Sequence, residues 1–156
     1  MRIFLIGDAR HPLWNGIGAA LVGGRWNSPG REAIYGSLSY ACALLEILAH
    51  ASIGRIPATH CFMVAEAPEN VSVERHDANA LPAGWDAENS VSARAVGDQW
   101  LAEARSAVLL VPSVVARLEW NALVNPLHPD AGQLILSSSE NLVWDKRLFE
   151  RRSVPG

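Results

Sequence analysis

The sequence predicts an α+β fold. Its apolar segments are mostly short and scattered, as the strands of small sheets are, and few segments are typical of helices. Strands and helices do not alternate regularly, as they would around a parallel sheet. The chain has 156 residues, which suffices for one domain with a substantial core. We therefore expect a single domain over residues 1–156, without linkers or internal repeats.

The predicted strands are apolar runs bounded by turn residues. They cover residues 2–6, 33–35, 61–65, 71–73, 107–111, 118–124 and 134–136, and a final short element covers 142–149. Residues 7–24 predict a loop with a short helical turn, because glycine, proline and small residues dominate them. Residues 81–92 predict a second loop, able to cover a site. The next segment, 96–105, predicts a helix.

The longest helix is predicted over residues 37–50. Ser37 or Ser39 can cap it, because a serine hydroxyl satisfies free backbone N–H groups at a helix start. Gly54 and Pro57 are expected to end it. Its most buried face is expected to hold Leu38, Ala41, Cys42, Leu45, Leu48 and Ala49.

Glu46 is the unusual residue of this helix. The helix is apolar on nearly every side, so we expect the carboxylate to be largely buried. Burying a carboxylate costs free energy unless it is paired or hydrogen-bonded. Arg25 lies in a glycine-rich turn, and Tyr35 ends a short strand just before the helix. Together the three side chains could form one polar pocket in an apolar wall.

The composition restricts the class of protein. Charged residues make up 19% of the chain, below the roughly 25% of ordinary soluble domains, so we expect a partner to cover part of the apolar surface. The net charge of -3 argues against a general nucleic-acid binder, and the basic residues near the end are expected to form a solvated tail. These residues are Lys146, Arg147, Arg151 and Arg152.

Other features favour a cytoplasmic protein. No apolar run approaches membrane length, and no tripartite leader opens the sequence. Cys42 and Cys61 lie in apolar runs and are expected to be buried, reduced thiols. The histidines are scattered, and we expect structural or surface roles for His50, His60 and His128.

The usual catalytic motifs are missing from the sequence. It contains no GxxxxGK[ST] loop, no GxGxxG, no GxSxG elbow and no cysteine or histidine pairs at metal spacing. We therefore expect no metal and no resident cofactor.

Arg25, Tyr35, Glu46 and Ser113 remain as candidates. The planar fork of an arginine suits phosphate, and an aromatic ring can stack on a flat heterocycle. A carboxylate can bind a sugar hydroxyl and stabilise an oxocarbenium-like cation. Together these properties suit cleavage of the bond between ribose and nicotinamide in NAD. Each residue alone also has an ordinary role: a tyrosine before a helix usually packs in the core, and an arginine in a turn usually pairs with a surface acid.

At these residues the sequence resembles the RES domain family, named for its arginine, glutamate and serine, whose members are toxins of bacterial toxin–antitoxin pairs. Residues 68–91 carry no match. The matching segments stand in the family's order: Gly16-Ile17-Gly18-Ala19, Gly23-Gly24-Arg25-Trp26-Asn27, Ile34-Tyr35, Leu44-Leu45-Glu46, Gly97-Asp98-Gln99-Trp100, Val111-Pro112-Ser113, and Asn121 through Asn125-Pro126-Leu127-His128-Pro129.

The resemblance implies an ADP-ribosyltransferase-like fold, with two small, mostly antiparallel sheets, a few helices and a cleft for NAD between the sheets. It implies that Arg25 holds the phosphates or ribose of NAD and that Tyr35 stacks on nicotinamide. Glu46 would bind the nicotinamide-ribose hydroxyl and stabilise the cation, and Ser113 would support the pocket.

The same resemblance implies that Trp26 takes part in substrate binding and that Asn125 is a substrate contact or lies just behind one. NAD would be the substrate. The partner would be an Xre-like helix-turn-helix antitoxin that covers the active site within a hetero-oligomer and makes the only contact with DNA.

Three functions stay open from the sequence. The first is an NAD hydrolase or phosphorylase, which transfers ADP-ribose to water or phosphate, depletes NAD and arrests growth. The second is an ADP-ribosyltransferase that modifies a specific protein. The third is an inactive module that only binds the antitoxin. The first two share one pocket, and the sequence does not show the acceptor.

Overall fold

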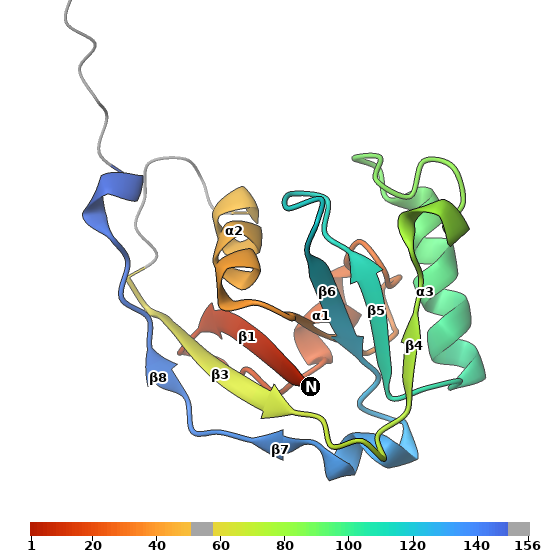
Figure 1. Ribbon diagram of the computed structural model, residues 1–156, viewed down its shortest axis with the longest axis horizontal. Helices are drawn as coiled ribbons and strands as arrows, with labels where there is room; N and C mark the ends of the chain where they lie inside the picture. The colour runs from red at the N-terminus through yellow and green to blue at the C-terminus, as the bar shows by residue number, and fades with distance from the viewer. Residues whose placement is uncertain (51–57, 150–156) are drawn as a thin grey trace, which may run out of the picture.

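The computed structural model describes residues 1–50 and 58–149, and its strands form one curled sheet with a few helices packed on it (Figure 1). The strands are β1 (Arg2–Asp8), β2 (Ile34–Ser37), β3 (His60–Glu66), β4 (Val73–Arg75), β5 (Val108–Pro112), β6 (Trp120–Val124), β7 (Ile135–Leu136) and β8 (Glu140–Asn141). The α-helices are α1 (Ile17–Val22), α2 (Tyr40–His50) and α3 (Val91–Glu103), and short 3-10 helices cover Ala78–Ala80, Pro129–Gln133 and Lys146–Leu148.

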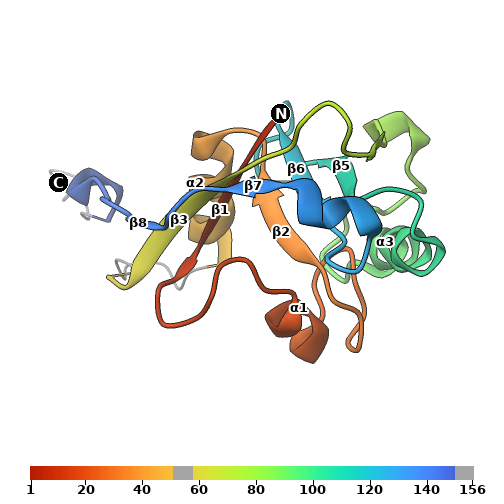
Figure 2. The ribbon, with the colours of Figure 1, turned by 90° about the horizontal axis from the view of Figure 1, so that it is seen from below.

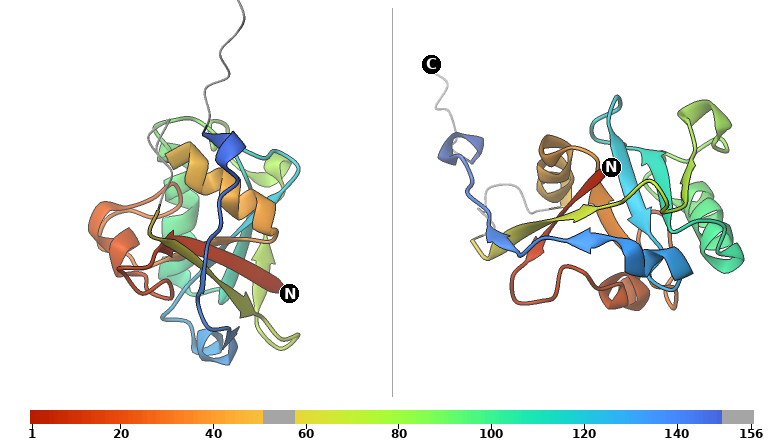
Figure 3. Two further views of the ribbon diagram at one scale, coloured as in Figure 1. Left: turned by 90° about the vertical axis from the view of Figure 1, so that its left-hand side faces the viewer. Right: turned by 60° about the horizontal axis from the view of Figure 1, so that its bottom comes forward.

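The α+β class is confirmed, but the expected pair of separate sheets is replaced by one sheet. Its strand order is β4-β5-β6-β2-β1-β3-β7, with β8 also paired to β3, and of these pairs only β4–β5 is parallel. The halves join because β2 bonds on both sides. It pairs with β6 along its whole length, whereas its pairing with β1 is the single contact Phe4↔Ser37. At this narrow junction the sheet curls (Figures 2 and 3).

The core has two parts because β5 is buried on both faces. Val108 and Leu110 point to the cluster that β1 and β3 complete, which includes Ile3. Leu109 and Val111 point to the opposite cluster, beneath α3 and residues 81–85. Successive residues of a strand face opposite sides, so an almost continuous apolar run is needed here.

Helix α3 begins five residues before the predicted 96–105 helix. Asn89 Oδ1 accepts the Val91 N–H at 3.2 Å, and Ser90 adopts a left-handed backbone with φ of 57°. These two features start a helix whose first turn, Val91-Ser92-Ala93-Arg94, has no clear apolar period.

Helix α2 lies against β1, β2 and β6 (Figure 3). It begins after Ser39, whose hydroxyl accepts the Cys42 N–H at 3.1 Å, so the cap predicted at Ser39 is confirmed. The predicted buried face is right at Cys42 and wrong at Ala41, Leu45 and Ala49, which are exposed. The second buried residue of the helix is Ala43, which was not predicted to be buried. A helix that is apolar all round carries no period from which its inner face can be read.

Smaller expectations have mixed outcomes. Cys42 and Cys61 are buried and free, as predicted. His128 orders its turn by accepting the Asp130 N–H at 3.0 Å. The strand predicted at 71–73 lies at Val73–Arg75 and the strand predicted at 118–124 at Trp120–Val124. The helix end at Gly54 and Pro57, and the tail residues Arg151 and Arg152, lie outside the described residues.

Within residues 1–50 and 58–149, no helix is both long and apolar enough to cross a membrane.

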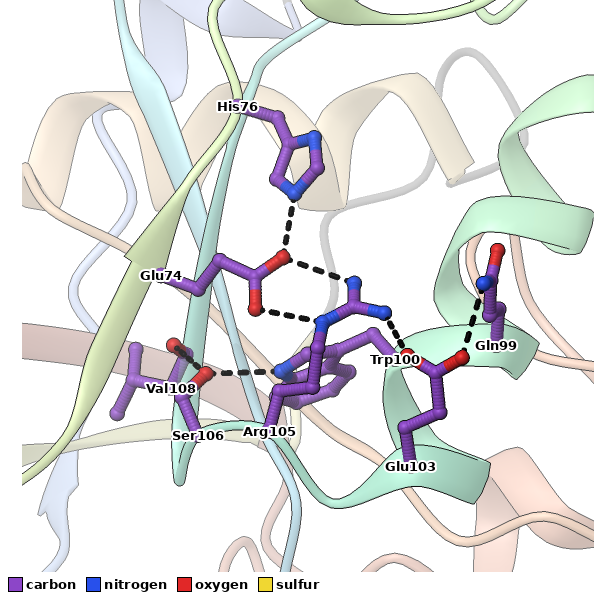
Figure 4. Close-up of polar contacts among 8 residues, drawn as sticks. All are labelled: Glu74, His76, Gln99, Trp100, Glu103, Arg105, Ser106 and Val108. Atoms are coloured by element: carbon purple, nitrogen blue, oxygen red, sulfur yellow. Dashed lines mark hydrogen bonds and ion pairs between the residues drawn. The ribbon is translucent and has the colours of Figure 1, made fainter.

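Charged side chains fasten the edge strand β4 to the end of α3 (Figure 4). Arg105 Nε and Nη2 donate to the two oxygens of Glu74 at 2.9 and 2.8 Å, and Arg105 also pairs with Glu103. His76 contacts Glu74 Oε1 at 2.6 Å. The Arg105 hydrogen bonds are the main reason that the pKa of Glu74 is lowered.

This network predicts a pH-dependent stability. Glu74→Gln is expected to lower the free energy of unfolding by about 1 kcal/mol near pH 7, because it removes the charge of a bidentate pair. A lowered pKa means that the contribution is present above the unfolded pKa, about 4.3, and is lost as pH falls through the folded pKa. Urea unfolding of both proteins near pH 7 and near pH 3 should therefore show the difference shrinking. The exposed Glu69→Gln is the matched control; a difference that persists in acid would contradict the assignment.

Candidate active site

A cavity of about 490 Å³ opens beside β2 and α2. Helix α1, the glycine-rich turn, and the segment after β5 complete its walls. This volume is in the range of small-molecule sites, about 300–1,000 Å³. Most of its wall is apolar, and the lining residues that carry polar side chains include Arg25, Tyr35, Ser37, Glu46 and Asn121.

The carboxylate of Glu46 lines the cavity and is held by hydrogen bonds from two other side chains. Its Oε1 accepts hydrogen bonds from Ser113 Oγ at 2.8 Å and from Asn121 Nδ2 at 2.5 Å. Ser113 Oγ accepts the Ala116 N–H at 2.9 Å, which leaves its own proton for Glu46. Among the described residues no hydrogen bond reaches Glu46 Oε2. One oxygen is therefore fixed by the protein and the other keeps its capacity for a ligand.

The burial predicted for Glu46 is wrong in degree. The residue is half-buried because it faces the cavity, not the core. The hydrogen bonding predicted for a carboxylate in an apolar helix is present, in the two bonds to Oε1. An apolar helix surface next to a cavity looks the same in sequence as one next to a core.

Tyr35 is fixed at its hydroxyl. The O–H donates to Asn27 Oδ1 at 2.6 Å and accepts the Trp26 N–H at 3.1 Å. Burial is the main cause that raises the pKa of Tyr35 above its usual value, so the phenol keeps its proton. A Cβ on Gly24 would lie 2.5 Å from the Tyr35 oxygen, which explains the glycine there. The ring is thus held rigidly as part of the cavity wall.

Asn27 organises the turn behind Tyr35. Its side chain is fully buried, and Nδ2 donates to the carbonyls of Ala19, Ser28 and Arg31 at 2.8, 3.2 and 2.9 Å. Helix α3 lies directly against this turn, because a Cβ on Gly97 would come within 1.7 Å of the Trp26 carbonyl oxygen. The GGRWN segment and the glycine of α3 are therefore parts of one packed unit.

Arg25 connects the cavity to the loop predicted at 81–92. Its Nη1 donates to the carbonyls of Ala87 at 2.8 Å and Trp85 at 3.3 Å. The described residues offer no hydrogen bond to Nε or Nη2, so those groups keep donors for an anion. The loop itself is packed, since Leu81 and Trp85 belong to the core beneath α3.

Three further residues were predicted for the site, and two of them lie at the cavity or at its carboxylate. Ser113 contacts Glu46, as described. Trp26 is also among the residues that line the cavity, although it is only 2% exposed and stacks on Trp85 with ring centroids 6.2 Å apart. Asn125 follows the far end of β6, where its Oδ1 accepts the Leu127 N–H at 3.1 Å. The structure thus leaves Asn125 in a turn away from the cavity and brings the other predicted residues to one region: Arg25, Trp26, Tyr35, Glu46 and Ser113.

Asn121 was not predicted as a site residue, although it donates to Glu46 and lines the cavity. A signal was available in the sequence, because Asn121 is a lone amide inside the predicted 118–124 strand. A buried amide needs partners, and an amide in a central strand therefore indicates a polar contact nearby.

The chain is an α+β protein whose cavity is lined by one hydrogen-bonded carboxylate. Comparison with family models matches residues 2–145 to the RES domain. The chain belongs to the RES domain family.

Named relatives agree with this membership. The chain is 37% identical over 140 residues to the Prs ADP-ribosylating toxin of Sphingobium sp. (strain YBL2). The matched region covers 88% of this chain and 87% of the relative. It is 34% identical over 118 residues to Toxin Res of Photorhabdus laumondii, covering 75% of each. This chain also superposes on a chain in the crystal structure of the M. tuberculosis MbcT–MbcA toxin–antitoxin complex, with a TM-score of 0.73 and 20% identity. The superposition covers 90% of this chain and 83% of the other, so the two chains share a fold.

Proposed function

We propose that this chain is a toxin of a bacterial toxin–antitoxin pair, and that its cavity binds NAD and cleaves the nicotinamide–ribose bond. One observation carries the proposal. Glu46 lines the cavity with Oε1 fixed by Ser113 and Asn121 and with Oε2 free of partners among the described residues. A carboxylate prepared in this way suits a substrate that has a hydroxyl to donate and develops positive charge.

The proposed reaction uses the three cavity residues in turn. Arg25 holds the diphosphate through its free donors, and the Tyr35 ring stacks on nicotinamide. Glu46 Oε2 accepts a hydrogen bond from the nicotinamide ribose and stabilises the oxocarbenium-like transition state. The C–N bond breaks, and its electron pair leaves with nicotinamide, which becomes neutral. An oxygen acceptor then captures the ribose carbon; with water the products are ADP-ribose, nicotinamide and a proton.

The acceptor distinguishes two candidate functions. Transfer to water or phosphate makes the chain an NAD hydrolase or phosphorylase. Transfer to a protein makes it an ADP-ribosyltransferase, which the Sphingobium relative, named for ADP-ribosylating Prs, favours as the second candidate. Incubating pure protein with labelled NAD alone, with phosphate, and with cell lysate separates them. Free ADP-ribose or its phosphate adduct supports the first, label in a protein band supports the second, and intact NAD in all three arms contradicts both.

We also expect an antitoxin that covers the cavity, of Xre-like helix-turn-helix type, in the cytoplasm. The shared fold with a toxin from a toxin–antitoxin complex supports a partner. Two of the residues that line the cavity, Val22 and Val115, are also exposed apolar side chains that a partner could cover. A stable specific interface would bury on the order of 1,600 Å².

If the antitoxin blocks the cavity directly, NAD and antitoxin compete. An inert NAD analogue at saturating concentration should weaken the binding of labelled antitoxin to this chain. The complex of the two proteins should not consume NAD. Calorimetric or fluorescence titration measures the antitoxin's affinity, and nicotinamide release measures NAD consumption by the complex. An antitoxin that binds with unchanged affinity and dissociation rate, in a complex that still consumes NAD, would show that it sits elsewhere.

A further inference from the structure

Asn121 has a second set of contacts, on the side away from Glu46. It lies on β6 opposite Ser37 of β2, and Ser37 Oγ donates to Asn121 Oδ1 at 2.7 Å. Cys42 Sγ, from the first turn of α2, lies 3.6 Å from the same oxygen. The carboxamide oxygen of Asn121 therefore faces two donors, Ser37 and Cys42, and its NH₂ group faces the Glu46 carboxylate.

The orientation of this carboxamide decides whether its contact with Glu46 is attractive or repulsive. An amide can turn over with almost no change in shape, exchanging its oxygen and its NH₂ group. With NH₂ toward Glu46 the contact is a charge-assisted hydrogen bond, and with oxygen toward Glu46 it is repulsive. Two donors on Oδ1 favour the first orientation.

Both donors are shielded from water. Ser37 and Cys42 are each 1% exposed. Burial is the main cause that raises the pKa of the Cys42 thiol, so the thiol keeps the proton that it can donate. A thiol is a weak donor, which leaves the Ser37 hydroxyl as the stronger of the two. Water cannot readily replace a hydroxyl at a site with so little exposure.

We propose that Ser37, assisted by Cys42, is a positioning residue that acts on Glu46 through Asn121. Ser37 fixes the amide, the amide and Ser113 together fix Oε1, and Oε2 is thereby aimed at the substrate. The inference rests on the proposed NAD cleavage for its kinetic consequence, whereas the orientation of Asn121 can be measured without any substrate.

Ser37→Ala is expected to lower kcat for nicotinamide release about tenfold, the effect of losing one net hydrogen bond, with KM almost unchanged. KM is spared because Arg25 and Tyr35 stay in place. Asn121→Ala should lower kcat about a hundredfold, as for loss of a donor to a catalytic group. The double variant should be no slower than Asn121→Ala alone, since Ser37 then has nothing to position. Ser37→Thr keeps the hydroxyl and should restore most of kcat.

The structural readout is the side-chain NH₂ signals of Asn121 in amide spectra of isotopically labelled protein. Ser37→Ala should shift or broaden these signals, because the amide gains a second orientation. Ser106→Ala is the matched control, because Ser106 is also buried and is hydrogen-bonded to Trp100 and Val108 (Figure 4). Ser106 is not among the residues that line the cavity. This variant should lose stability without altering the Asn121 signals or kcat.

The outcomes separate the two levels of the proposal. Unchanged Asn121 signals in Ser37→Ala, or additive losses in the double variant, overturn the positioning role. Altered signals with full kcat in Ser37→Ala, while Glu46→Gln is inactive, also overturn it. If the unmodified chain releases no nicotinamide, the proposed function fails, and the Asn121 signals alone decide whether Ser37 orients the amide.

Discussion

Glu46→Gln is expected to slow nicotinamide release by about a hundred- to a thousandfold. The glutamine carbonyl can still accept the bonds from Ser113 and Asn121 that hold Oε1. Its amide nitrogen replaces Oε2, which removes both the acceptor for the ribose hydroxyl and the negative charge opposite the developing cation. The loss should therefore fall on kcat while the fold survives.

The measurement is steady-state nicotinamide release together with thermal unfolding. Glu119→Gln is the matched control, because it removes one negative charge from an exposed residue on the loop before β6, outside the cavity wall. The control should keep the parent rate. A Glu46→Gln protein that consumes NAD and arrests growth as the parent does would remove Glu46 from the reaction.

Arg25→Lys is expected to weaken NAD binding by about ten- to a hundredfold, even though the charge is kept. Each charge-assisted hydrogen bond contributes about 1.5–3 kcal/mol, and a lysine cannot offer the planar fork to a phosphate. The guanidinium also holds the carbonyls of Trp85 and Ala87, which a lysine cannot reach in the same geometry. Calorimetry with an inert NAD analogue measures the affinity directly.

A second arginine separates direct contact from loop anchoring. Arg117 pairs with Asp86 of the same loop at 2.7 Å but does not line the cavity. If Arg25 binds the phosphates itself, Arg117→Gln should leave the affinity nearly unchanged. Equal losses in both variants would mean that the loop, and not the Arg25 fork, is responsible, and unchanged affinity in Arg25→Lys would return that residue to a structural role.

The sequence predicted which residues gather around the cavity better than it predicted their contacts. Arg25, Tyr35, Glu46 and Ser113 could be selected because residue type and motif spacing are local properties. The hydrogen-bond partners of Glu46 were harder to predict. Asn121 reaches Glu46 only because β6 pairs with β2, and the sequences of two strands so far apart do not show that they pair. The carbonyl partners of Arg25 depend in the same way on how residues 85–87 fold back.

The fold shows the same division. Strands with strong apolar runs, such as Val108–Pro112, were placed within a residue or two. The joining of two expected sheets into one depends on the single pairing Phe4↔Ser37, which no periodicity encodes. Helix α2 was predicted, but most of its buried face was not. A helix that is apolar on nearly every side shows no periodicity that marks the buried face, and its polar residue Glu46 faces a cavity.

The most direct test uses the purified chain, free of any partner, and NAD labelled separately in the nicotinamide and in the adenosine portion. Products are separated over time in buffer, in phosphate and in cell lysate, beside Glu46→Gln. We expect free nicotinamide to appear in step with the loss of NAD, and the adenosine label to appear in ADP-ribose or in an ADP-ribose adduct, with the variant nearly inactive. Folded, unmodified protein that leaves NAD intact in all three conditions would contradict cleavage at the nicotinamide–ribose bond.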